Sequence, residues 1–520
     1  MSFVVRQIQT AISRITEWAD KNGFVFSVSK TKCMHFCRRR GLNPDPEILL
    51  NGSVIPVVSE EKFLGVLLDS KLTFRPNVSN LKKKCNKALG LLKVISSKSW
   101  GADYFSLQKI YKSLVLSKLD YCSIVYGSAV KTVLQSLDSV HHQGLRIISG
   151  AFRTSPVQSL YVITGELPLQ LRRDKQCIKY YFKVKGNRRH PMYDRMLNPI
   201  FGLLYANKPS CIPPFGHRIR KILSCHSIEN FMPLPEEEPP PPWSNFNVCT
   251  IDDLNNLPKQ DTPHFVYLQL FYFHRQCYKD FNTAYTDGSK AENRVGSAAV
   301  FNNLTKSERL NSYCNVFTSE IYAIFMILSQ LRFCNAKKWI IYTDSRSSLE
   351  ALLHISRQSH PLVNKVFNLY TSLLEEGYSI LFCWIPGHMG IIGNEKADNA
   401  AREARRISWP YVPLPDIDRI LKSKIRRSWQ EIWDAQINNK LHFIQPSVGG
   451  FKASNFNRNI NVKLVRLRIR HTYFTHQNLL HSELTPTCQT CNANYTVRHI
   501  LSECEIFNNC RIKWFGKAHP

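Results

Sequence analysis

Short apolar runs alternate with helical patterns between residues 281 and 406, in an order typical of an α/β domain. "FNTAYTD" (281–287) and "VGSAAVFN" (295–302) are strand-like, and "RLNSYCNVF" (309–317) is a third candidate strand. The apolar segment that follows, at 319–333, predicts a helix. The remaining predictions are a strand at 338–344, helices at 347–356 and 361–377, a strand at 378–387 and a polar helix at 393–406. Three closely joined strands, followed by strands separated by helices, predict a mixed sheet with helices packed on it.

Three other regions differ from this domain in their patterns. Residues 1–200 alternate helical patterns with short strands: "KFLGVLLD" (62–69) is strand-like, and residues 77–96 have helical spacing with a basic face. The next region is weakly patterned, and the four consecutive prolines of "PLPEEEPPPPW" (233–243) favour an extended linker. The last region is helical and basic and ends in a Cys/His cluster. The sequence therefore predicts four parts, at 1–200, 201–280, 281–406 and 407–520.

Charge and composition narrow the class of partner. The chain has 520 residues and a formal net charge of +30, which favours a polyanion such as nucleic acid, although charge alone also fits non-specific contact with anions. No stretch approaches 18 consecutive apolar residues, so we expect no membrane span. The amphipathic N-terminus lacks the features of a signal peptide, and the sixteen cysteines are then most simply reduced thiols. We expect an intracellular protein of the cytoplasm or nucleus, of unspecified oligomeric state.

Four acids of the α/β region lie where they could act together. Asp287 and Asp344 each end a predicted strand, Glu320 opens the apolar helix, and Asp398 lies in the first turns of the last helix. Acids near helix N-termini also complement the helix dipole, and Asp, Ser and Gly favour turns, so each motif alone has a structural explanation. If the two strands are parallel neighbours, however, both aspartates emerge at one edge of the sheet. Clustered carboxylates repel one another unless cations neutralise them, so a metal site is expected. Oxygen ligands favour Mg²⁺ or Mn²⁺, and a pair of such ions can promote phosphodiester cleavage.

These motifs resemble those of type 1 ribonuclease H over about a quarter of the chain. "TDGS", "TSEIYA", "YTDS" and "WIPGHMGIIGNEKAD" occur in the family's order and at its separations. The resemblance implies two Mg²⁺ (or Mn²⁺) ions held by Asp287, Glu320, Asp344 and Asp398, and hydrolysis of the RNA strand of RNA–DNA hybrids. It also implies that Glu320 recognises the RNA 2′-hydroxyl, and that His388 assists proton transfer and product release. This sequence departs from the usual pattern at Gly387, where the family has Ser.

The N-terminal region resembles a different part of a retroelement. Residues 15–36, followed by "EKFLGVLLDSKLTF" (61–74), are similar to the end of the palm and the thumb of reverse transcriptases from jockey-like non-LTR retrotransposons. The resemblance places Lys30 in the motif after the polymerase aspartates and "KFLG" (62–65) at the primer grip. The family's catalytic aspartates are expected before residue 15, where no such motif occurs, so we do not expect this chain alone to complete a polymerase site. A basic helix face could grip a template–primer duplex through Lys82, Lys83, Lys84 and Lys87, and the basic, aromatic stretch 172–189 suits phosphate contact with stacking.

The C-terminal cluster has the spacing C-x2-C-x7-H-x4-C. Its members, Cys488, Cys491, His499 and Cys504, could close a tetrahedral zinc site, although fortuitous spacing in a Cys-rich chain is the alternative. The pattern also resembles the zinc knuckle that ends many jockey-like polyproteins. Just upstream, "KLVRLRIRH" (463–471) alternates arginine with apolar residues, and its side chains could add phosphate contacts through Arg466, Arg468 and Arg470.

The predicted fold is thus an RNase H-like mixed sheet flanked by helices. A helical reverse-transcriptase thumb region precedes it, and a helical basic tail with a small zinc motif follows it. Two functions remain open: a Mg²⁺-dependent nuclease acting on RNA–DNA hybrids, and a non-enzymatic remnant that binds RNA or hybrids. A third possibility, a sugar- or nucleotide-binding α/β domain, lacks a Gly-rich phosphate loop of the expected type.

Overall fold

The computed structural model divides into two compact units, each described here by itself. The first unit comprises Met1–Gln176, Pro209–Ile212 and Arg426–Pro520, and the second comprises Cys177–Lys208 and Pro213–Ile425. The structure describes residues 2–37, 45–207, 212–238, 241, 243, 247–254, 262–356, 358–450, 456–481 and 485–517. Within these ranges, no helix has the length and apolar character needed to cross a membrane.

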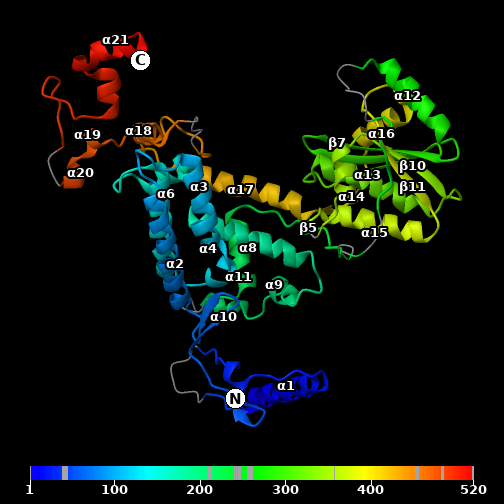
Figure 1. The fold of residues 1–520 in the computed structure, drawn as a ribbon, viewed down its shortest axis with the longest axis horizontal. Helices are drawn as coiled ribbons and strands as arrows, with labels where there is room; N and C mark the ends of the chain where they lie inside the picture. Colours follow the sequence, from blue (N-terminus) through cyan, green and yellow to red (C-terminus); the bar gives the residue numbers. More distant parts are fainter. Residues whose placement is uncertain are drawn as a thin grey trace. The chain divides into compact units, whose positions relative to one another are not determined.

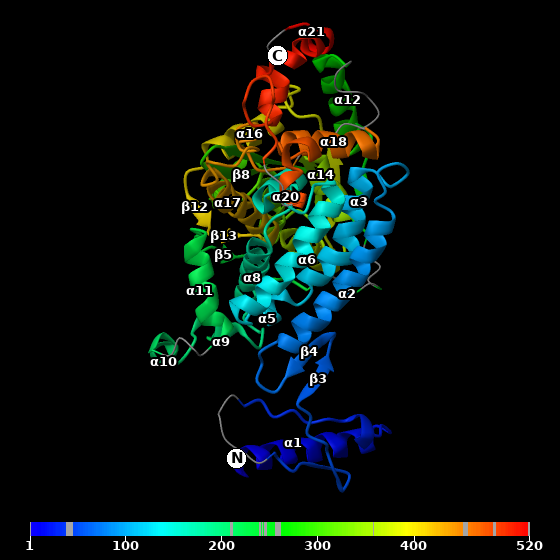
Figure 2. The same ribbon diagram turned by 90° about the vertical axis from the view of Figure 1, so that its left-hand side faces the viewer.

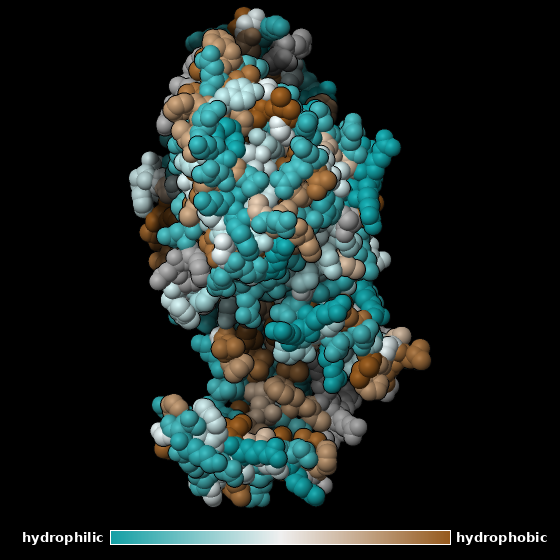
Figure 3. Space-filling view, turned by 90° about the vertical axis from the view of Figure 1, so that its right-hand side faces the viewer, coloured by the Kyte–Doolittle hydropathy of each residue, from teal (hydrophilic) through white to brown (hydrophobic). Residues whose placement is uncertain are grey.

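The first unit begins with a helix and two small hairpins. Helix α1 (Ser2–Lys21) packs against the buried side chains near the β1–β2 hairpin (Leu49–Leu50 and Ser53–Val54). The segment expected as one strand at 62–69 is instead the hairpin of β3 (Glu60–Phe63) and β4 (Val66–Asp69). The physical reason is that Leu64 and Gly65 both have positive φ, 45° and 86°, which is the backbone of a tight hairpin turn. Figure 3 shows hydrophobic side chains exposed among hydrophilic ones in the lower half of its face.

Helices make up most of the rest of the first unit. The predicted helix at 77–96 is α2 (Arg75–Val94), and it runs beside α6 (Lys131–Ser149) (Figures 1 and 2). Between and after them lie α3 (Tyr104–Tyr111), the π-helical turn Lys112–Leu116, α4 (Ser117–Asp120), α5 (Ser123–Tyr126), α7 (Val157–Thr164) and the start of α8 (Leu169–Lys185). The C-terminal elements are the end of α17 (Leu414–Asp434), α18 (Arg458–Arg468), α19 (Tyr473–His476), α20 (Asn478–His481) and α21 (Asn508–Phe515). Both the N-terminal region and the tail are therefore mainly helical, as predicted.

The second unit is built around a seven-stranded mixed sheet in the order β12-β9-β8-β7-β10-β11-β6. The strands are β6 (Thr250–Ile251), β7 (Asn282–Ala291), β8 (Arg294–Phe301), β9 (Leu304–Leu310), β10 (Lys338–Thr343), β11 (Ser379–Trp384) and β12 (Ile407–Trp409). β7, β8 and β9 are antiparallel, whereas β10, β11 and β6 run parallel to β7. The third strand was predicted in the wrong place: residues 309–317 contain only the last residues of β9, a turn and the start of the next helix.

Helices cover both faces of this sheet (Figure 1). Because successive strand residues point to opposite faces, Trp339 and Ile341 of β10 pack with α13 (Val316–Leu331), α14 (Arg346–Leu353) and α15 (Pro361–Glu375). Ile340 and Tyr342 face the other way, toward α12 (His264–Cys277). Helix α16 (Ile392–Glu403) packs on β7 and β8. The mixed sheet flanked by helices is confirmed.

The region interpreted as a linker contains ordered elements. Helices α10 (Gly202–Asn207), α11 (Phe215–Cys225) and α12 lie in it, after α9 (Tyr193–Leu197). Strand β5 (Met232–Pro233) pairs with β13 (Tyr411–Val412), and β6 extends the main sheet beside β11. Part of the proline run, 239–240 and 242, lies outside the described residues. Thus the described residues 247–254 and 262–280 contribute a strand and a helix to the α/β fold.

Candidate active site and metal centres

Two aspartates emerge side by side from parallel strands. The register of β7 and β10 pairs Thr286 with Thr343, so the next residue on each strand is an aspartate, Asp287 or Asp344. The Thr286 hydroxyl donates to the Tyr342 carbonyl at 3.2 Å, which ties the two strands together just below these acids. The structure thus brings the two carboxylates together where β10 ends beside the middle of β7, at the C-terminal side of the parallel strands, where ligands of α/β sheets bind.

The "TDGS" segment is a strand and not the expected turn. β7 continues through Gly288 to Ala291, paired with β8. A Cβ atom on Gly288 would lie 2.4 Å from the Glu320 amide nitrogen and 2.6 Å from the Ser319 carbonyl carbon. The glycine therefore allows the first turns of α13 to approach the strand closely, which brings Glu320 beside Asp287. At the second motif the strand does end: β10 stops at Thr343, and α14 begins two residues after Asp344.

Three carboxylates form a compact, largely buried cluster. One oxygen each of Asp287, Glu320 and Asp344 lies within 4.8 Å of the others, and Asp287 and Glu320 are only 6% and 9% exposed. Burial, together with the charge of Asp344, raises the pKa of Asp287 to about 7. Burial and the neighbouring Asp287 raise the pKa of Glu320 well above its usual value. Glu320 Oε2 is buried and accepts no hydrogen bond from any described residue. A divalent cation bound by this oxygen-rich set would relieve the repulsion, so the residues fit a Mg²⁺ or Mn²⁺ site.

The fourth acid stands near this cluster but has protein partners. Asp398, on α16, lies 2.8 Å from the Arg402 guanidinium one turn later and 3.7 Å from Nδ1 of His388. Its charge contributes to the raised pKa of Asp287, after burial and Asp344. Arg402 was not predicted from the sequence, although its i,i+4 spacing from Asp398 on a predicted helix indicates an ion pair.

The loop between β11 and α16 presents His388 to solvent. Its side chain is 67% exposed and its backbone has φ of 58°. A Cβ atom on Gly387 would lie 2.3 Å from Asp344 Oδ2, so glycine at this position leaves the space beside that carboxylate open. Trp384 Nε1 donates to the Asp344 carbonyl at 3.0 Å and fixes the end of β10 against the end of β11.

The C-terminal Cys/His residues also come together, within the first unit. One ligand atom each from Cys488, Cys491, His499 and Cys504 lies within 4.8 Å of the others. The Sγ atom of Cys504 is 3.7 Å from that of Cys488 and 3.8 Å from that of Cys491. The amide of Cys488 donates to Ala493 and its carbonyl accepts from Asn492, which closes the tight knuckle between the first two cysteines. Interaction with His499 lowers the pKa of the Cys488 thiol to about 6, so the donor set suits zinc.

The lysines predicted to contact nucleic acid differ in their exposure to solvent. Lys83, Lys84 and Lys87 are exposed on α2, and Lys82 is half-buried. Lys30 lines a surface hollow together with Lys62 of the "KFLG" motif.

The arginines of 463–471 lie on or just after a helix and contact the protein itself. Arg466 donates to the Gly150 carbonyl at 2.8 Å and stacks 3.8 Å above the Phe152 ring. Arg468 donates to Gln445 at 3.0 Å, and Arg470 lies 5.4 Å from the Phe443 ring. These contacts stabilise the fold and leave less of each side chain for phosphate.

Comparisons with known proteins agree with the geometry. The RNase H family model matches residues 280–406, which form an RNase H domain. The chain is 30% identical over 144 residues to the RNA-directed DNA polymerase from mobile element jockey of Drosophila funebris, a match covering 28% of this chain and 16% of that protein. It is 27% identical over 169 residues to a retrovirus-related Pol polyprotein from type-1 retrotransposable element R1 of Bradysia coprophila, covering 32% and 17%. Ribonuclease H1 of Homo sapiens is 28% identical over 147 residues, covering 25% and 51%. The chain thus spans from about a sixth to about half of these relatives, and both resemblances, to RNase H and to jockey-like polyproteins, are confirmed.

Proposed function

We propose that the RNase H domain hydrolyses the RNA strand of RNA–DNA hybrids with divalent metal ions. The observation that supports this most strongly is the cluster of Asp287, Glu320 and Asp344, whose oxygens lie within 4.8 Å of one another where β10 ends beside the middle of β7. The match of residues 280–406 to RNase H and the similarity to human ribonuclease H1 support the substrate class. A binding protein without catalysis would have no need of a buried, unpaired carboxylate oxygen such as Glu320 Oε2.

The acids have a shared task in this proposal. Asp287, Glu320 and Asp344 would hold Mg²⁺ or Mn²⁺, and Asp398 would complete the set when it separates from Arg402. Bound ions of this kind activate water and stabilise the leaving oxygen of a phosphodiester.

Two side chains would act on the substrate directly. Glu320 would accept a hydrogen bond from the RNA 2′-hydroxyl, the group that distinguishes RNA from DNA. His388 is exposed on its loop and 3.7 Å from Asp398, and it would assist proton transfer and product release.

The flanking regions would bind nucleic acid without taking part in cleavage. Cys488, Cys491, His499 and Cys504 would hold zinc, and the exposed lysines of α2 together with Lys30 would contact phosphates. The similarity to jockey and R1 proteins supports a role within a retrotransposon-derived polyprotein. Polymerase activity is not part of the proposal for this chain alone.

Cleavage of matched duplexes tests the proposal. The full chain is incubated with Mg²⁺ and end-labelled RNA–DNA hybrid, RNA duplex or DNA duplex of the same sequence. We expect cleavage of the RNA strand of the hybrid only, leaving 3′-hydroxyl and 5′-phosphate ends. Equal cleavage of the RNA duplex would contradict the substrate class, and tight binding of the hybrid without cleavage would favour the non-enzymatic alternative.

A further inference from the structure

We propose that β6 and α12, which precede residues 280–406, form a positioning element of the active site. They hold the end of β10 through His274 and the His388 loop through Leu268. This inference rests on the proposed function for its kinetic consequences, although its structural part can be tested without cleavage.

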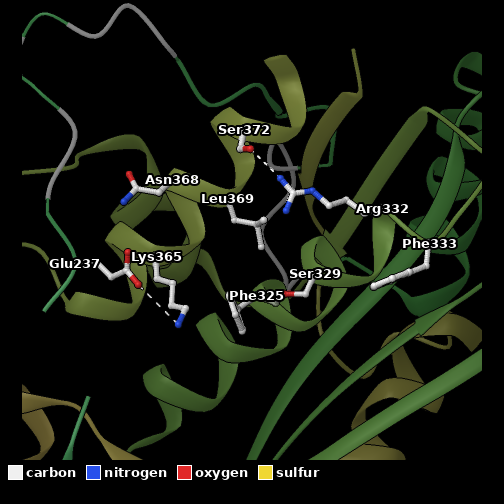
Figure 4. Close-up of a pocket in the computed structure, with 9 residues that line it drawn as sticks. All are labelled: Glu237, Phe325, Ser329, Arg332, Phe333, Lys365, Asn368, Leu369 and Ser372. Carbon is white, nitrogen blue, oxygen red and sulfur yellow. Dashed lines mark hydrogen bonds and ion pairs between the residues drawn. The ribbon is translucent and has the colours of Figure 1, made fainter. Parts of the chain in front are cut away.

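Described residues on the N-terminal side of β6 contact the face formed by α13 and α15. Leu234 and Val248 are buried in the core on that face. Between them, Glu237 pairs with Lys365 at 3.7 Å, beside a hollow lined by both helices (Figure 4), and the Glu238 carbonyl accepts from Asn368 at 3.3 Å. The Cys249 amide then donates to the Tyr370 hydroxyl at 3.2 Å, which delivers β6 to the edge of the sheet. The segment is therefore anchored at several points before it reaches α12.

A buried histidine joins α12 to the strand that bears Asp344. His274 is 2% exposed, with Nδ1 3.0 Å from Asp253 Oδ2 and Nε2 3.1 Å from the Tyr342 hydroxyl. The Asp253 carboxylate can only accept, so Nδ1 donates to it, while Nε2 shares a hydrogen bond with the Tyr342 hydroxyl. Burial lowers the pKa of His274, and Asp253 opposes the shift. Because Tyr342 lies two residues before Asp344 on β10, this chain of hydrogen bonds fixes the strand just below the carboxylate.

An aromatic layer extends the same contact to β7 and α16. The ring centroid of Phe271 lies 5.3 Å from that of Tyr342, which in turn stacks at 5.1 Å on Tyr285, two residues before Asp287. A Cβ atom on Gly393 would lie 2.3 Å from the Tyr285 ring, so the first turn of α16 rests directly on this layer. One side chain of α12 thus supports the strands of both aspartates.

A second side chain of α12 reaches the catalytic loop. Leu268 lies against Gly390, where an added Cβ would be 3.4 Å from Leu268 Cδ1. Gly390 is two residues after His388, and the neighbouring Ile391 is 3% exposed in the same apolar cluster as Phe271. The His388 side chain is exposed, so few contacts of its own hold it in place. The buried part of its loop, which packs on α12, therefore determines the position of the imidazole.

The experiment measures loop protection and kinetics in the full chain. Leu268→Ala is compared with Leu268→Met and with Phe265→Ala, whose side chain is 62% exposed on the same helix. We expect Leu268→Ala to speed amide hydrogen exchange in residues 385–391 about tenfold, with no change in β8. We expect kcat on the hybrid to fall about tenfold while KM changes by less than about twofold. Leu268→Met should restore both, and Phe265→Ala should match the wild type.

The outcomes separate this inference from the proposed function. If the wild type fails to cleave the hybrid, the proposed function is wrong. The hydrogen-exchange rates of residues 385–391 in Leu268→Ala then decide whether α12 positions the loop. Wild-type exchange and wild-type kcat in folded Leu268→Ala would overturn the inference. Should that variant not fold, Tyr342→Phe keeps the ring and removes only the hydroxyl that His274 contacts. It should reduce kcat about threefold at unchanged KM, and no reduction would overturn the inference.

Discussion

Adding one methyl group to Gly288 should misplace Glu320. Because Gly288 does not have positive φ, alanine is compatible with the backbone there, and the effect is purely one of space. The added Cβ would lie 2.4 Å from the Glu320 amide nitrogen, whereas ordinary contact begins at 3.4 Å. The obstacle is backbone, so α13 must move away from β7 by about 1 Å, a displacement that can cost about 100-fold in rate at an active site. The crowding itself should destabilise the domain by about 1–3 kcal/mol.

Hybrid cleavage and thermal unfolding of Gly288→Ala measure the two effects. The matched control is Gly90→Ala in α2, where an added Cβ meets nothing within 4 Å. We expect the control to keep wild-type activity and to gain slightly in stability, because alanine favours helix. Wild-type cleavage and melting temperature in Gly288→Ala would refute the claim that this glycine sets the distance between Asp287 and Glu320.

Three further predictions concern other parts of the molecule. Cys504→Ser should abolish zinc binding by the full chain, measured by metal analysis, whereas Cys510→Ser, an exposed cysteine outside the cluster, should not. Burial lowers the pKa of His141 to about 3, so as the pH falls the unfolded chain binds a proton at this histidine before the folded chain does. The free energy of unfolding should therefore fall by up to about 1.4 kcal/mol per pH unit between about pH 6.5 and pH 3. His141→Gln should flatten this slope, measured by urea unfolding at a series of pH values. Arg402→Gln should free the Asp398 carboxylate and tighten Mn²⁺ binding measured by calorimetry, and unchanged or weaker binding would show that the arginine does not compete with metal.

The sequence predicted the central elements well because their patterns were strong. The apolar helix α13 and the buried strands β10 and β11 have long apolar runs bounded by polar residues. β9 was misplaced because "LTKSERL" is a polar, only partly buried strand with a weak pattern, and the apolar residues after it belong to a turn and α13. The role of Gly288 depends on how closely a helix approaches a strand, which no local pattern specifies.

The proline-rich pattern led us to miss β6 and α12, which precede the RNase H domain. The run at 233–243 suggested a linker, yet Leu234 within it is buried and the aromatic segment at 264–277 forms α12. The four acids were found because each has its own motif, but only the structure shows that three of them cluster while Asp398 pairs with Arg402. Arg466 was expected to face phosphate, and its contacts with Gly150 and Phe152 depend on residues more than 300 positions earlier.

The most direct test of the proposed nuclease is hybrid cleavage by Asp344→Asn. The full-length variant is compared in Mg²⁺ with the wild type and with Asp280→Asn, which changes an exposed aspartate outside the cluster. We predict that Asp344→Asn is folded by circular dichroism but has no detectable cleavage, while Asp280→Asn cleaves like the wild type. Undiminished cleavage by Asp344→Asn would contradict the assignment of this carboxylate cluster as the catalytic centre.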